Sequence, residues 1–430
     1  MVEWIDTKSR RQDFAIKLLE ESFRRNENGE PSFVGWGYRT AVALLVDDLK
    51  FPQGLASNTL AGIVRNAIWE MARIGSFSDA EMLNCTRNAY ISHQRLLPKK
   101  FVLLSSVSLY NTTAHARKTW LKHVCFWPPS KYADARAQIS DEIEQVIPAA
   151  ISNRYSRLYV SVAARDMHEA FEQALFQLDL VRAIWNLQIN RQYLTRTASG
   201  LAQPVNQILR GPIHTLHVPS GALATTIFNY ETDYTNIAFP YNWGPTVSSI
   251  QTFFLRVERK LQVSPVSDFI KCALVDYVRA LDHKENKRAF LDLWSLLERL
   301  VGSANPAESK KTTGTRTAFL IGQDVEYVQA VLARLAERRN ELVHGRSEAP
   351  EMEAALHHIR EYVEYAIEFL LQNKYDFQSP HDFKEFLDTP KDVAMLARRL
   401  SLMLKGRAHL TPRRKSDEGA EDSETPPTPA

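Results

Sequence analysis

The chain has 430 residues, of which 44% are hydrophobic and 24% are charged. This composition excludes a collagen-like, wholly disordered or multi-spanning membrane protein, and the length predicts two or three domains. Lys plus Arg number 53 against 50 Asp plus Glu, and a net charge of +3 excludes a strongly basic protein whose whole surface attracts nucleic acid. Any basic site must therefore be local.

The first residues, MVEWIDTKSRRQDF, mix charges of both signs and are not expected to form a secretory signal. The longest apolar run, 41–46, is far shorter than the roughly 20 residues that span a bilayer. Cys85, Cys125 and Cys272 are odd in number and form no CxxC pair, a pattern typical of a reducing compartment. We expect a cytoplasmic protein with no membrane partner.

Residues 1–95 are expected to form a helical N-terminal region. Between residues 10 and 94, apolar side chains recur at spacings of three and four, and Gly29, Pro31, Pro52 and Gly54 separate the segments.

Residues 96–245 are expected to form a small α+β domain. FVLLSSVSLY at 101–110 and RLYVSVA at 157–163 predict strands. The second strand leads to Asp166, which can cap a long helix with Glu169 three residues further on. Residues 200–245 hold many Gly and Pro and predict irregular β structure, in which His214 and His217 alternate as on the edge of a strand.

Residues 246–410 are expected to form a helical bundle, so that the fold class is mainly α. Apolar periodicity predicts five helices, at 246–262, 267–283, 285–301, 324–344 and 351–372. Residues 302–317 are rich in Gly, Ser, Thr and Lys and predict a loop, and Gly345 is expected to end the fourth helix.

Two shorter helices are predicted at 381–388 and 391–405. The second is basic and amphipathic and is expected to dock on the bundle rather than on a membrane. Residues 411–430 contain no Leu, Ile, Val or aromatic residue and predict a disordered tail.

The segment ERRNELVHGR at 337–346 is the densest polar cluster of the predicted bundle. Asn340 and His344 are four residues apart, about 40° on the helical wheel, while Arg339 lies about 140° from His344 and must reach with its long side chain. A guanidinium can hold the scissile phosphate of an RNA, and an imidazole can move a proton near neutral pH. The alternative is a purely structural role, in which this segment is a solvated helix end whose cations complement the helix dipole.

RNELVHG at 339–345, preceded by the helix FLDLWSLLERL at 290–300, resembles the HEPN domain, whose motif is Arg, four to six residues, then His. The stricter pattern of Arg-Asn, three residues and His occurs once in the chain. The order of the strand and helix RLYVSVAARDMHEAFEQALFQLDLVRAIWNL, the stretch PIHTLHVPSG and the bundle resembles Apea-like HEPN proteins of prokaryotes over roughly residues 98–375.

The resemblance implies a HEPN-type bundle and a metal-independent endoribonuclease, a toxin or antiviral defence effector that needs no cofactor. Arg339 and His344 would be the catalytic pair, Asn340 an orienting residue, and Glu298 a polar partner from the preceding helix. Such enzymes are commonly homodimers in which two Arg…His motifs meet at one composite site.

A trigger or regulator would bind residues 1–245. The chain departs from related systems because it carries no nucleotidyltransferase motif and no second HEPN motif of the Cas type. HEPN domains can also lose catalysis, so the alternative function is a non-catalytic scaffold that binds RNA, a nucleotide or a partner protein.

Overall fold

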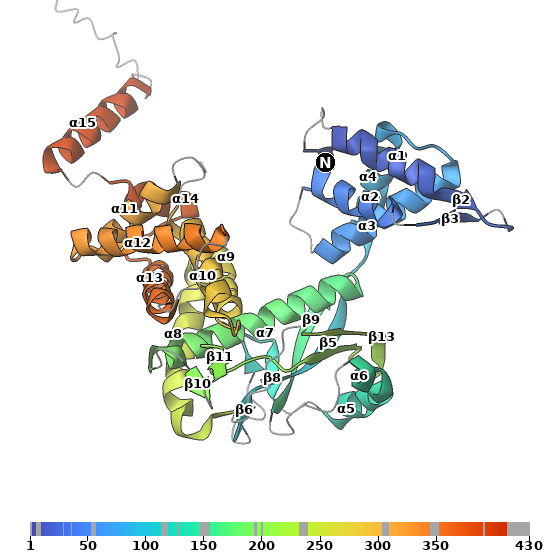
Figure 1. Cartoon of the computed structure of the whole chain (residues 1–430), viewed down its shortest axis with the longest axis horizontal. Helices are drawn as coiled ribbons and strands as arrows, with labels where there is room; N and C mark the ends of the chain where they lie inside the picture. The colour runs from blue at the N-terminus through green and yellow to red at the C-terminus, as the bar shows by residue number, and fades with distance from the viewer. Residues whose placement is uncertain are drawn as a thin grey trace, which may run out of the picture.

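The computed structural model describes residues 2–410, except 6–9, 29, 36, 53–56, 113–118, 127–128, 147–154, 193–195, 199–200, 232–239, 303–308, 345–351 and 390–391. Helices make up most of the described chain, as the sequence predicts, and an antiparallel sheet lies in the middle region (Figure 1). Among the helices of these described ranges, none combines the length and the hydrophobicity of a membrane-spanning segment. The predicted disordered tail, 411–430, lies outside the described residues.

The N-terminal unit is helical, as the apolar spacing predicts, and its described residues include α1 (Arg10–Ser22), α2 (Gly37–Asp48), α3 (Ser57–Ile74) and α4 (Asp79–Arg95). Two short antiparallel pairs accompany them: β1 (Glu3–Trp4) with β4 (Leu49–Lys50), and β2 (Phe23–Arg25) with β3 (Pro31–Phe33). The buried faces of the helices form a hydrophobic core of their own. Figure 1 shows this unit standing apart from the sheet and the bundle.

The middle region is built on an antiparallel sheet in the order β13-β12-β5-β9-β8-β7. The two predicted strands are its centre, and they pair from Lys99 opposite Ala164 to Val107 opposite Ser156. The strands are β5 (Lys99–Val107), β7 (Thr119–Trp120), β8 (Val124–Phe126), β9 (Ser156–Ala164), β12 (Ile213–His217) and β13 (Leu223–Tyr230).

The expectation that His214 and His217 lie on a strand edge is wrong. They belong to β12, which pairs with β5 on one side and β13 on the other, and all five residues of β12 are buried. Neutral histidines fit such a strand because local hydrogen bonds satisfy both ring nitrogens.

Smaller elements complete the middle region. They are β6 (Leu109–Tyr110) in parallel with β14 (Tyr241–Asn242), the pair β10 (Arg196–Ala198) and β11 (Leu201–Gln203), α5 (Ser130–Ala137), α6 (Ser140–Val146), and the 3-10 turns η2 (Asn190–Gln192) and η3 (Gly244–Thr246).

The predicted long helix is α7 (Met167–Ile189), which lies across the sheet (Figure 1). Its predicted cap is confirmed, because the backbone N–H of Glu169 donates to Asp166 Oδ1 over 2.8 Å. Every residue from Leu178 to Leu187 is buried, polar ones included. Such all-round burial indicates that α7 has neighbours on both sides: β9 and β5 on one, and helices of the bundle on the other.

The bundle contains the five predicted helices as α8 (Val247–Val263), α9 (Ser267–Ala280), α10 (Asn286–Val301), α12 (Val325–Val343) and α13 (Met352–Gln372). The two smaller predicted helices appear as α14 (Pro380–Leu387) and α15 (Val393–Leu410). Helix α10 packs mainly against α13 and α9, and its buried stripe includes Phe290, Leu293 and Leu297.

The predicted loop at 302–317 is wrong for its second half, which belongs to α11 (Ser309–Ile321). Gly and Thr disfavour a helix locally, but tertiary contacts override that preference here. Arg316 is buried and donates to the Val301 carbonyl oxygen over 2.9 Å and to Asp388 Oδ1 over 2.7 Å, which fixes α11 between α10 and α14.

Helix α15 does not pack on the bundle, contrary to the expectation from its sequence. Its apolar side chains are exposed, Leu400 by 53% and Met403 by 63%, and Figure 1 shows the helix standing off from the bundle. A hydrogen bond from Arg399 Nη1 to the Asp388 carbonyl oxygen, 3.3 Å long, links it to the end of α14.

The sheet, α7 and the bundle share one hydrophobic core that extends from Phe101 to Leu387. Trp185 of α7 packs edge-to-face against Trp120 of β7 and at a steep angle against Trp243, with ring centroids 5.2 Å apart in both pairs. The domain boundaries that the sequence places after residues 95, 245 and 410 stay predictions.

Candidate functional site

The predicted catalytic motif lies at the C-terminal end of α12. Val328, Leu332 and Leu335 bury one face of this helix against the bundle core, and the exposure of the chain rises toward His344. Burial of the first turns therefore fixes the position of the polar last turns.

Two hydrogen bonds link three of the predicted site residues. Arg339 Nη1 donates to Asn340 Oδ1 over 3.5 Å, and the His344 backbone N–H donates to the Asn340 carbonyl oxygen over 3.0 Å. The side chains of Arg339 and Asn340 are half-buried, whereas His344 is exposed as the C-terminal cap of the helix. The structure thus joins Arg339 to Asn340 and leaves the His344 imidazole open to solvent.

Glu298 lies one helix away, in the last turn of α10, which contacts α12. Its side chain is half-buried, and its backbone carbonyl oxygen accepts a 2.7 Å hydrogen bond from Gly302 that closes α10. Glu298 takes part in neither of the two bonds that join the other three residues. Gly345, the predicted helix stop, lies outside the described residues.

A second cationic side chain, Arg338, precedes the pair. Its Nη1 lies 3.7 Å from Glu341 Oε2, one turn along the helix. Because the Arg338 side chain is only 12% exposed, the final turns offer a ligand the Arg339 guanidinium and an accessible imidazole, which suit an anionic, phosphate-bearing ligand. Among the described residues, no group of three or more His, Cys, Asp or Glu side chains is arranged to hold a metal ion.

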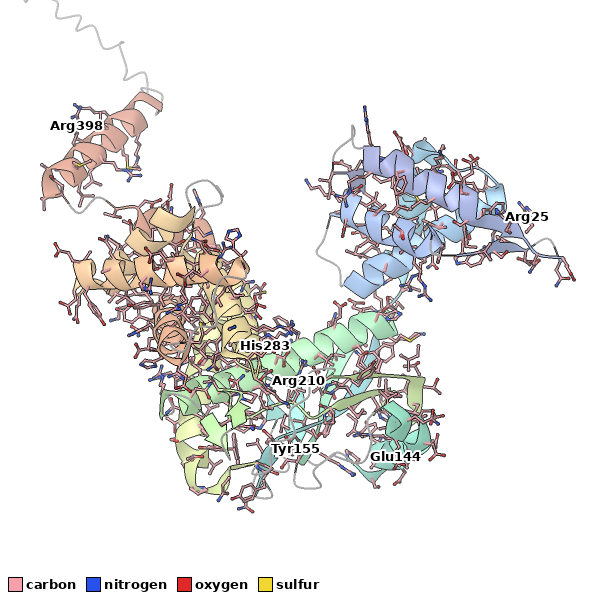
Figure 2. All side chains as sticks on the ribbon, viewed as in Figure 1. Arg25, Glu144, Tyr155, Arg210, His283 and Arg398 are labelled. Carbon is pink, nitrogen blue, oxygen red and sulfur yellow. The ribbon has the colours of Figure 1, made fainter. Side chains whose placement is uncertain are left out.

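A charge cluster that the sequence analysis missed lies between the sheet, α7 and α9. Asp179 of α7 is fully buried and accepts hydrogen bonds from Arg182 (2.7 Å), Arg279 (2.8 Å) and Arg210 (3.3 Å). Arg182 also donates to Asp282 over 2.7 Å. Figure 2 labels Arg210 close to α7 near the middle of the molecule.

The pKa of Asp179 reflects this environment. Burial would raise it, but the Arg210, Arg182 and Arg279 guanidiniums outweigh burial and lower the pKa to about 2. One signal in the sequence could have revealed the cluster: Asp179 and Arg182 interrupt an apolar helix at a spacing of three, which pairs them on one face.

The cluster continues into the sheet as a chain of polar contacts. Arg210 Nη2 and His214 Nε2 both donate to Glu231, each over 2.9 Å, and Ser105 Oγ lies 2.8 Å from His214 Nδ1. The order Ser-His-Glu is that of a hydrolytic triad, but Ser105 is completely buried in β5. These residues therefore tie β5, β12 and β13 to α7.

The two buried histidines predict that acid destabilises the protein. Burial lowers the pKa of both His214 and His217 below 6.5, the value expected for an unfolded chain. As the pH falls below about 6.5, the unfolded state takes up protons that the folded state does not, so the free energy of unfolding falls by up to about 1.4 kcal/mol per pH unit for each histidine.

Denaturant unfolding at several pH values between about 7 and 5 measures this slope. His214→Gln is expected to be less stable at neutral pH but to show a shallower slope, and His381→Gln, at a histidine whose side chain is 79% exposed, is the matched control. A slope that His214→Gln leaves unchanged would contradict the prediction.

Comparison with protein-family models finds no match, and comparisons with curated proteins and with solved structures find none either.

Proposed function

We propose that the protein is a metal-independent endoribonuclease of HEPN type that acts as a toxin or antiviral defence effector. The observation that carries the proposal is the polar end of α12, where Arg339 is hydrogen-bonded to Asn340 and His344 is exposed on the next turn. The resemblance of RNELVHG to the HEPN motif supplies the reaction type.

The proposed reaction is transesterification of RNA. The 2′-oxygen forms a bond to phosphorus and loses its proton, while the bond from phosphorus to the 5′-oxygen breaks and that oxygen gains a proton. His344 moves a proton in this exchange, and Arg339 stabilises the negative charge that builds on the phosphorane. Asn340 holds Arg339 in place, and Glu298 is the polar partner from α10. The products are a 2′,3′-cyclic phosphate and a 5′-hydroxyl.

A homodimer is part of the proposal, because two copies of the motif would complete one site. The exposure of Val343, 54%, supports it, since an apolar side chain next to His344 is surface that a second copy can cover. Residues 1–245 would bind the trigger that controls cleavage.

The test is incubation of the purified full chain with labelled pools of cellular and structured RNA in EDTA. Cleavage with cyclic-phosphate and 5′-hydroxyl ends is the expected result. Saturable RNA binding without turnover, under conditions in which the chain is folded and dimeric by light scattering, would instead support the non-catalytic scaffold. Full-rate cleavage by a monomer would rule out the composite site.

A further inference from the structure

Helix α15 presents a large apolar surface to solvent. Apart from the half-buried Leu396, every residue of the helix whose burial is described, 393–407, is exposed. Large apolar side chains that are each more than half exposed are Val393, Met395, Leu400, Leu402, Met403 and Leu404. Single exposed apolar side chains are ordinary, but a group of them on one element marks a surface that contacts a protein or a membrane.

Most of these side chains form a stripe along one side of α15. At 100° per residue, the stripe covers an arc of about 100° and consists of Val393, Leu396, Leu400, Met403 and Leu404. Two cationic residues, Arg398 and Lys405, lie about 150–170° from the middle of this arc, on the opposite side of the helix. The helix is therefore amphipathic, with an aliphatic side and a cationic side.

The charge of this part of the chain has one sign. Residues 393–415 contain seven Lys or Arg and no Asp or Glu, although the whole chain has a net charge of only +3. Four of these cations belong to α15, and the other three follow it in the sequence at 413–415. A surface that covers the aliphatic stripe must therefore also be anionic.

The composition of α15 favours a lipid surface over RNA or protein. The helix has no Phe, Trp or Tyr, so it lacks the rings on which unpaired bases stack and the aromatic anchors that dominate protein interfaces. A second copy would bring the same cations and no carboxylate to pair with them, so two α15 helices repel each other. An anionic bilayer offers hydrocarbon to the stripe and phosphate groups to the cations.

We propose that α15 is a peripheral anchor that binds membranes rich in anionic phospholipid. The helix lies in the plane of the interface, with its stripe among the acyl chains and Arg398 and Lys405 among the headgroups. Figure 1 shows α15 standing off from the bundle, which leaves it accessible to a surface as large as a membrane. The inference goes beyond the proposed ribonuclease activity and does not rest on it.

The test is co-sedimentation of the full chain with vesicles of equal parts phosphatidylcholine and phosphatidylglycerol, and with vesicles of phosphatidylcholine alone. Saturable binding to the anionic vesicles only is expected. Replacing both Arg398 and Lys405 by alanine should weaken binding about 30-fold, because each cation near an anionic surface contributes about fivefold. Leu400→Gln should weaken binding about tenfold, because a leucine side chain is lost from the hydrocarbon while the helix propensity is kept.

Two matched variants separate the stripe from exposed apolar surface in general. Leu402→Gln changes an exposed leucine of the same helix that lies about 160° from Leu400. Leu97→Gln changes a leucine outside α15 that is 82% exposed. Both should bind anionic vesicles as the unaltered chain does, and circular dichroism confirms that each variant is folded.

Absence of binding to the anionic vesicles, or equal binding to both kinds of vesicle, would overturn the proposal. So would equal losses for Leu400→Gln and Leu402→Gln. If vesicles do not bind and Leu400→Gln instead converts a dimer into a monomer by light scattering, a second copy covers the stripe. If vesicles do not bind and the alanine variant of Arg398 and Lys405 loses affinity for labelled RNA, the cations serve RNA binding.

Discussion

Replacing His344 by alanine is expected to lower the rate of RNA cleavage by about 10²–10⁴-fold, the usual contribution of a general acid or base. The imidazole is exposed at the end of α12, and its backbone rather than its ring holds the last helical turn. The free energy of unfolding should therefore change by less than about 0.5 kcal/mol. The loss of activity would then be chemical and not a consequence of unfolding.

Cleavage of labelled RNA in EDTA by the two chains, followed by thermal unfolding of both, measures this effect. His381→Ala is the matched control, since His381 is also an exposed histidine of the bundle. On α12 itself, Arg339→Ala should reduce cleavage and Arg334→Ala, at a side chain that is 61% exposed, should not. Equal rates for His344→Ala and the unaltered chain would show that the activity lies elsewhere or comes from a contaminant.

The second large effect is on stability. Asp179→Ala is expected to lower the free energy of unfolding by about 3–5 kcal/mol, because removing one partner of a buried ion pair leaves the opposite charges uncompensated. Arg182, itself fully buried, loses one of its two carboxylate partners, and Arg210 and Arg279 lose a hydrogen bond each.

Denaturant unfolding followed by circular dichroism measures this loss. Asp268→Asn on α9 is the control, because the Asp268 side chain is 94% exposed and pairs with Lys271 at the surface, where an ion pair contributes little. A change of under about 1 kcal/mol for Asp179→Ala would mean that the cluster does not hold the middle region to the bundle.

Much of the fold could be predicted from local pattern. The apolar stripe of α10, the capping of α7 by Asp166 and the alternation in β9 are each encoded within a few consecutive residues. Helix α11 could not be predicted in this way, since Arg316 reaches its partner Asp388 across 72 residues. For the same reason, the interior position of β12 could not be predicted, because its neighbour β5 lies more than a hundred residues earlier in the chain.

The candidate site likewise contains residues whose placement a local pattern predicts and residues whose placement depends on distant parts of the chain. Arg339 and Asn340 are neighbours on one helix end and His344 follows one turn later, so their spacing is enough to predict that they share the end of α12. Glu298 depends on how α10 meets α12, which no local pattern encodes. The charge cluster around Asp179 is still less accessible to sequence reasoning, because its members come from α7, α9 and the chain before β12.

The cluster around Asp179 also limits the order in which parts of the chain can fold during synthesis. Asp179 and Arg279 are 100 residues apart, and a ribosome that adds about 5–20 residues per second needs about 5–20 s to deliver the second after the first. The hydrophobic core of the N-terminal unit is made of residues within the first ninety. The apolar face of α7 stays uncovered until α8 and α9, which pack on it, have been synthesised. The nascent chain therefore passes through a stage in which the core of its first unit can form while the apolar face of its central helix is still exposed to other chains.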